Sequence, residues 1–185
     1  MSSRPYKEIG CLVVGSKGCG KSTFIKWLYE HATDPGTTSS IRKTDRGVVH
    51  TVDIPCPGKH SKTKKFFTRY VRMHLYEVDP ESSPGTWPVT ECAIIMIDLC
   101  QEGFGKYDKW VERIRQQLPD LVSYGVRRYV VVGNKMDQAP FERKITRVMQ
   151  NVLYKDWDSL HDISSLDGTN IYAPLNSLIE RCKRK

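Results

Sequence analysis

The chain has 185 residues, of which 39% are hydrophobic, and this is enough for one domain of ordinary size with a buried core. Its formal net charge of +8 makes nucleic acid and anionic membrane surfaces candidate partners. The longest apolar run, residues 92–99, is too short to span a bilayer and contains Asp98, so no transmembrane segment is expected. Six cysteines without a C-x-x-C pair predict reduced thiols in a cytoplasmic protein. We therefore expect one domain over residues 1–185.

Apolar patterning predicts alternating strands and helices along the chain. The predicted strands span residues 7–14, 47–54, 66–78, 92–99, 128–133 and 157–163. The predicted helices span residues 21–31, 107–118, 141–154 and 172–183. Because only a short polar loop joins the second and third strands, they should form an antiparallel hairpin. The remaining alternation predicts an α/β fold with a mostly parallel six-stranded sheet, one antiparallel hairpin strand and helices on both faces.

The segment 15–22, GSKGCGKS, fits the phosphate-binding loop pattern G-x-x-x-x-G-K-S. A predicted strand leads into it and a predicted helix follows it, as this type of loop requires. Glycines let the backbone curl so that its N–H groups and the positive end of the helix point at phosphates. Lys21 would reach the β- and γ-phosphates, and the Ser22 hydroxyl would bind Mg²⁺. The predicted phosphate-binding residues are Gly15, Ser16, Lys17, Gly18, Cys19, Gly20, Lys21, Ser22 and Thr23.

A second motif, N-K-x-D at residues 134–137, follows an apolar run that is typical of a buried parallel strand. Asp137 can accept two hydrogen bonds from the ring N–H and exocyclic amine of guanine, whereas adenine would leave a buried carboxylate unpaired. We expect Asn134 to pair near the base and to hold the phosphate loop, and the Lys135 stem to lie over the base. The tetrad favours a guanine nucleotide over the adenine nucleotide of a kinase or ATPase.

With these motifs the chain resembles a small GTPase of the Ras superfamily, nearest to the Rab and Ras branches, over almost its whole length. A third segment, ISSLDG at residues 163–168, resembles the S-A-K segment of that family. The resemblance implies a P-loop NTPase, small-GTPase fold with GTP or GDP and Mg²⁺ as cofactors. It also implies that Ser164, Ser165 and Leu166 border the guanine, with the Ser165 backbone N–H meeting O6. Leu166 replaces the usual Lys, which leaves an apolar lid over the base.

The second switch segment departs from the family motif D-x-x-G, and two alignments compete. Without a gap, Glu77 takes the place of the Asp that holds the Mg²⁺ shell, and Pro80 and Glu81 take those of Gly and Gln. Shifted by two, Asp79 keeps the carboxylate and serines replace Gly and Gln. The first alignment is favoured slightly because it needs no slip in the strand. Either one predicts slow hydrolysis, since Pro lacks the N–H that touches the γ-phosphate and Ser is too short to orient water.

The first switch segment, residues 34–40, is predicted to be a loop. The family needs one Thr there to complete the Mg²⁺ shell, and Thr37, Thr38 and Thr44 lie within reach along the sequence. Spacing from Lys21 favours Thr38, so the predicted metal ligands are Ser22 and Thr38. No residue could be assigned as catalytic.

Two functions fit this sequence. One is a GTP/GDP molecular switch with slow intrinsic hydrolysis that binds protein effectors. The other is a GTP-bound pseudo-GTPase scaffold that assembles protein partners without hydrolysis. Whether the chain is an enzyme is left open.

Lys and Arg are densest at residues 59–65 and 181–185. The second run, with Cys182, is expected to be a basic tail and resembles the lipidated tails of the superfamily, but it is not a C-a-a-X box, so prenylation is not expected. Palmitoylation, peripheral attraction to acidic lipid and a plain basic surface are the alternatives. Direct nucleic-acid binding is disfavoured because no aromatic platform is interleaved with the basic residues. Trp87 is either a partner anchor or a packing residue.

Overall fold

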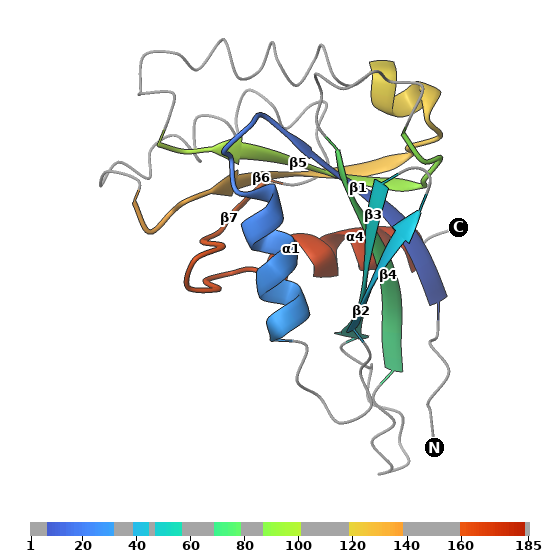
Figure 1. Cartoon of the computed structure of the whole chain (residues 1–185), viewed down its shortest axis with the longest axis horizontal. Coiled ribbons are helices and arrows are strands. Elements are labelled where there is room, and N and C mark those ends of the chain that lie inside the picture. Colours follow the sequence, from blue (N-terminus) through green and yellow to red (C-terminus); the bar gives the residue numbers. More distant parts are fainter. Residues whose placement is uncertain are drawn as a thin grey trace.

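The structure, a computed structural model, describes residues 7–31, 39–44, 47–56, 69–78, 87–100, 119–138 and 160–183. These residues form an α/β fold around one seven-stranded sheet with the order β2-β3-β4-β1-β5-β6-β7 (Figure 1). The strands are β1 (Lys7–Gly15), β2 (Ser39–Thr44), β3 (Gly47–Cys56), β4 (Arg69–Val78), β5 (Cys92–Asp98), β6 (Arg128–Asn134) and β7 (Leu160–Asp162). The helices are α1 (Lys21–Glu30) and α4 (Ala173–Lys183), and residues 119–123 form a further short helical segment.

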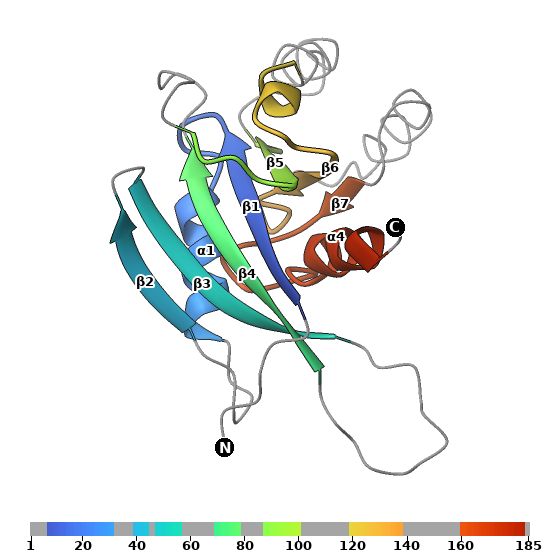
Figure 2. The same cartoon turned by 90° about the vertical axis from the view of Figure 1, so that its right-hand side faces the viewer.

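Five neighbouring strands, β4, β1, β5, β6 and β7, run parallel, whereas β3 is antiparallel to both β2 and β4. The predicted hairpin of β3 and β4 is therefore confirmed. The prediction of six strands is wrong, because β2 adds a seventh at the edge beside β3 (Figure 2). When β2 is set aside, the other six strands contain one antiparallel member, β3, as the sequence predicts.

The strand β2 was missed because its sequence, SSIRKT, has no alternating hydrophobic pattern. Its side chains are partly or fully exposed, and 55% of Ile41 is accessible to solvent. It is a strand because its backbone pairs with β3, from Ser39 opposite Val52 to Thr44 opposite Gly47. Residues 39 and 40, which were expected in a loop, therefore belong to the sheet.

The other predicted elements that fall in the described residues are present with shifted ends. The predicted strands 157–163 and 66–78 correspond to β7 and β4, and residues 157–159 and 66–68 lie outside the described residues. The predicted helices 107–118 and 141–154 lie outside the described residues, as does the basic run 59–65.

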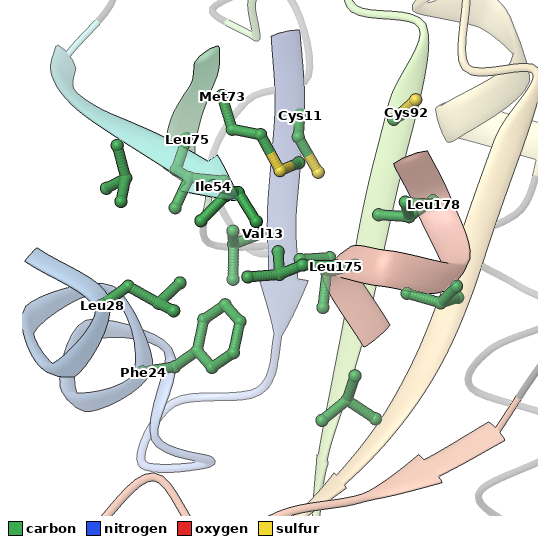
Figure 3. Close-up of a cluster of buried hydrophobic side chains, with 14 of the residues drawn as sticks. Cys11, Val13, Phe24, Leu28, Ile54, Met73, Leu75, Cys92, Leu175 and Leu178 are labelled. Carbon is green, nitrogen blue, oxygen red and sulfur yellow. The ribbon is translucent and has the colours of Figure 1, made fainter. Parts of the chain in front are cut away.

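The central strands β1, β5 and β6 are buried on both faces of the sheet. Val13 and its neighbours on one face pack against α1 and α4, and Figure 3 shows Phe24, Leu28, Leu175 and Leu178 converging there. Alternate residues of β1 point to the other face, where the short helical segment contributes Leu121. Helices therefore cover both faces, as predicted, and the polar ends of the parallel strands are left at the sheet's carboxyl edge.

One partly buried ion pair supports the register of the β3–β4 hairpin. Asp53 and Arg72 are direct partners across the two strands. Arg72 Nε donates to Asp53 Oδ1 at 2.8 Å and Arg72 Nη2 donates to Oδ2 at 3.0 Å. Asp53 is only 4% exposed, so a slip of one residue would leave a buried carboxylate without this partner. The pairing holds β4 in register with β3.

Candidate nucleotide-binding site

The loop between β1 and α1 turns tightly at the carboxyl edge of the sheet. Cys19 N donates to Ser16 O at 3.3 Å, and Gly18 and Gly20 have φ angles of 82° and 98°. A Cβ atom on Gly20 would also collide with the side-chain nitrogen of Asn134. Both the backbone angle and the close approach therefore require glycine at position 20.

Lys21 is a buried cation at the start of α1, with only 7% of its surface exposed. Its Nζ donates to Gly15 O at 2.6 Å and to Ser16 O at 3.1 Å. Among the described residues no carboxylate forms an ion pair with Lys21. Because a buried charge without a counter-ion is costly, an anion at this point would stabilise the site.

The first turn of α1 adds backbone donors to the same place. The first helical bond runs from Phe24 N to Gly20 O at 2.9 Å. Within the described part of the chain, the backbone N–H groups of Ser22 and Thr23 have no backbone acceptor, whereas that of Lys21 bonds to the Cys19 sulfur. These donors and the positive end of the helix dipole lie at the position that the sequence assigns to phosphates.

Ser22 contacts an acidic side chain from a distant strand. Its Oγ donates to Glu77 Oε1 at 2.7 Å, and Glu77 lies next to the end of β4. This is the carboxylate that the ungapped alignment places beside Mg²⁺. Thr38 and residues 79–86 lie outside the described residues, so the competing alignment has no described side chain at this point.

The oxygen atoms of Ser22 and Glu77 fit the preference of Mg²⁺ for hard ligands. In the residues that the structure describes, no group of three or more His, Cys, Asp or Glu side chains could hold a metal. Mg²⁺ in nucleotide sites commonly uses one or two protein ligands, with water and phosphate oxygens as the others. The residues present therefore fit a magnesium ion that arrives with a nucleotide, and they do not form a separate metal cage.

Asn134 joins three segments that are far apart in the sequence. Its Nδ2 donates to Cys19 O at 2.9 Å, which is the contact with the glycine loop that the sequence predicts. Its Oδ1 accepts hydrogen bonds from Ser165 N and Ser165 Oγ, both at 2.9 Å. Asn134 is 1% exposed, so these three bonds are shielded from water. One buried amide therefore ties the glycine loop, the N-K-x-D tetrad and the segment 163–168 together.

Lys135 is held by a residue that sequence reasoning did not assign. Its Nζ donates to Asp98 Oδ2 at 2.6 Å, and Asp98 also accepts from Cys100 N at 2.9 Å. The hydrogen bond with Asp98 raises the pKa of Lys135 above its usual value. Asp98 is 2% exposed at the carboxyl end of β5, and a lone acid inside the apolar run 92–99 was the available signal. The ammonium is thus tied to the sheet, which restricts the path of the Lys135 stem.

Asp137 is exposed in the turn that follows β6. Among the residues described, no donor bonds to its carboxylate, so both oxygens can accept from a ligand. The two neighbouring residues predicted to contact the base differ in their surroundings. Ser165 N is already bonded to Asn134, whereas the Leu166 side chain is 69% exposed. Ser164 is buried and its Oγ accepts from Asp167 N at 3.3 Å, which shapes the loop.

The expected basic tail is wrong over residues 181–183, and one of the two alternatives for Trp87 is confirmed. Residues 181–183 form the last turn of α4 and are not a tail, and Cys182 is only 6% exposed, with its sulfur against that of Cys92. Palmitoylation of Cys182 would require its side chain to leave this packing. Trp87 is 5% exposed and packs on Tyr124 with ring centroids 5.3 Å apart, which confirms the packing alternative for this residue. In the part of the chain described, no helix has the length and apolar character needed to cross a membrane.

No protein-family model matches the chain, and a search of curated proteins gave no significant match. Function is therefore inferred from the residues and geometry of this site alone.

Proposed function

We propose that this chain is a guanine-nucleotide-binding protein of the small-GTPase kind, with the nucleotide bound along the carboxyl edge of the sheet. The observation that carries the proposal is Asn134, whose three hydrogen bonds bring the glycine loop and the N-K-x-D tetrad into one site. Chance occurrences of two short motifs would not be expected to meet through a shared buried side chain.

The phosphates would lie over the first turn of α1. Lys21 supplies a buried positive charge that lacks an ion pair within the described residues, and the free N–H groups of Ser22 and Thr23 supply donors. The polyphosphate would replace the two carbonyl oxygens that Lys21 now contacts. Such a site binds the charge of the ligand and leaves base selection to other residues.

The guanine would lie between the tetrad and the segment 163–168. Asp137 would accept from the ring N–H and the exocyclic amine. Because Ser165 N is bonded to Asn134, guanine O6 either displaces that bond or accepts from the next amide, that of Leu166. The exposed Leu166 side chain would then cover one edge of the base.

Mg²⁺, when bound, would neutralise negative charge on the phosphates. Ser22 and Glu77 would hold it, and Glu77 would also orient the Ser22 hydroxyl before the ion arrives. Thr38 remains the sequence-based proposal for the third protein ligand.

The contact between Ser22 and Glu77 also favours the second candidate function, a GTP-bound scaffold. It supports the ungapped alignment, which puts Pro80 where the family has the Gly that contacts the γ-phosphate. Proline has no N–H to offer, so hydrolysis would be slow or absent. Protein partners would then bind the surface of the GTP-bound protein, and no hydrolysis step would be needed.

Nucleotide identity is the decisive measurement. Titrations of the purified full chain with GTP, ATP and XTP in the presence of Mg²⁺ should show a preference for GTP. Asp137→Asn should weaken GTP binding by at least about 100-fold and favour XTP, because the carboxylate–guanine pair is lost. Asp120→Asn, at an exposed position in the short helical segment, is the matched control and should leave GTP affinity unchanged. Equal affinity for GTP and ATP in the unaltered chain contradicts the proposal.

Single-turnover hydrolysis separates the two functions. Conversion of bound GTP to GDP over hours, with partner binding that differs between the two states, supports the switch. Retained GTP, with partner binding that ignores the γ-phosphate, supports the scaffold.

A further inference from the structure

Three buried cysteines lie together in the core, away from the candidate nucleotide site. Cys11 on β1 and Cys92 on β5 are register partners on neighbouring strands, and Figure 3 shows both side chains in the same core. Cys182 belongs to the same core cluster and comes from the last turn of α4. Cys92 is the first residue of β5, so the group lies toward the amino end of that strand.

Two of these sulfur atoms are in direct contact. Cys92 Sγ and Cys182 Sγ are 3.2 Å apart, whereas the Cys11 thiol is directed to Leu12 O at 3.5 Å. A disulfide has a sulfur–sulfur distance of about 2.05 Å, so the pair needs an approach of only about 1 Å. The cysteines are separated by 90 positions in the sequence, so the fold alone brings them together.

The surroundings favour Cys182 as the reactive member of the pair. The hydrogen bond with Cys92, together with the nearby cations Lys7 and Arg128, lowers the pKa of Cys182, against the opposing effects of burial and Glu91. Lys7 Nζ also donates to the Cys182 carbonyl at 3.1 Å. Burial instead raises the pKa of Cys11, which makes its thiol a poor nucleophile.

We propose that Cys92 and Cys182 are a redox modification site that forms an intramolecular disulfide between β5 and α4 when the protein meets a peroxide. The Cys182 thiolate attacks one oxygen of hydrogen peroxide, the O–O bond breaks, and hydroxide leaves as a sulfenic acid forms on Cys182. The Cys92 thiol then attacks the Cys182 sulfur, the S–O bond breaks, and the Cys92 proton passes to the departing hydroxide to give water. The hydroxide of the first step takes up the proton that Cys182 lost when it ionised. Overall, two thiols lose two electrons and one hydrogen peroxide is reduced to two waters.

The disulfide would fasten the end of α4 to the sheet. The loop that this disulfide closes contains β6, β7, Asn134 and Ser165. The crosslink would therefore reduce the conformational entropy of this whole segment in the unfolded chain. A loop of this length is expected to raise the melting temperature by about 10 °C. Hydrogen exchange in α4 should slow as well, because its last turn could no longer open freely.

The test uses the purified full-length chain treated with hydrogen peroxide under native conditions. Intact mass should fall by two hydrogen atoms, and a peptide map should contain a Cys92–Cys182 crosslink that a thiol reductant reverses. The melting temperature should rise on oxidation and return on reduction. Cys182→Ser should abolish the crosslink and the rise, whereas Cys11→Ser and Cys100→Ser should keep both.

The peptide map of the unaltered chain decides the proposal even where a serine variant folds poorly. A crosslink from Cys182 to Cys11 overturns it, as does addition of oxygen atoms to Cys182 without any disulfide. So does a Cys92–Cys182 pair that appears only after denaturation.

Discussion

Asn134→Ala tests the buried amide that joins the three segments of the site. The change removes three hydrogen bonds and leaves Cys19 O, Ser165 N and Ser165 Oγ without their partner in a region shielded from water. At about 1 kcal/mol net for each bond, the free energy of unfolding should fall by about 3 kcal/mol. Such a loss is a large share of a total stability of about 5–15 kcal/mol, and the variant should still fold.

The assay is urea unfolding without nucleotide, followed by circular dichroism and tryptophan fluorescence. Leaving out the nucleotide makes the result independent of the proposed function. Asn176→Ala is the matched control because Asn176 lies half-buried within α4, away from the glycine loop. Its stability should change by no more than about 0.5 kcal/mol.

A cost below about 1 kcal/mol for Asn134→Ala would refute this reasoning, since unsatisfied buried partners should cost more than that. A cost equal to that of Asn176→Ala would refute it too. Either result would mean that the amide does not hold the segments together.

Three further outcomes follow from the same geometry. Gly20→Ala should weaken GTP binding by about tenfold or more in a calorimetric titration, because the left-handed backbone and the contact with Asn134 both exclude a Cβ atom. Asp98→Asn should cost about 1–2 kcal/mol in urea unfolding, because Lys135 loses its charged partner; an unchanged midpoint would show that the pair contributes nothing. Burial lowers the pKa of His161 below its usual 6.5 in the folded state. As the pH drops below about 6.5, His161 is therefore protonated more readily in the unfolded chain, and the free energy of unfolding should fall. His161→Gln should flatten that decline in unfolding midpoints measured from about pH 7.5 to 5, and an equally steep decline would assign it to other groups.

The glycine loop and the N-K-x-D tetrad could be found from the sequence because their requirements are local. Glycine marks positions where φ is positive, and the flanking apolar patterns mark β1 and α1 on either side of the loop. The strand β2 could not be found in this way. A polar edge strand has no hydrophobic alternation, and only its pairing with β3 makes it a strand.

The contacts between motifs needed the fold. Ser22 meets Glu77 because β4 lies beside β1, and Lys135 meets Asp98 because β6 lies beside β5. Neither neighbour relation can be read from spacing along the chain. The contact of Cys182 with Cys92 likewise needed the fold. The spacing of Leu175, Leu178 and Cys182 puts the cysteine on the apolar face of α4, but it does not show which strand that face meets.

The sequence by itself indicated most of the local elements and the glycine-loop and N-K-x-D motifs, since both depend on short-range pattern and chemistry. The tertiary structure alone decided which of those residues lie together, which polar segment forms the edge strand of the sheet and which thiols are in contact. The physical reason is that the core packs on both sides of the central strands, and this places side chains together regardless of their distance along the chain.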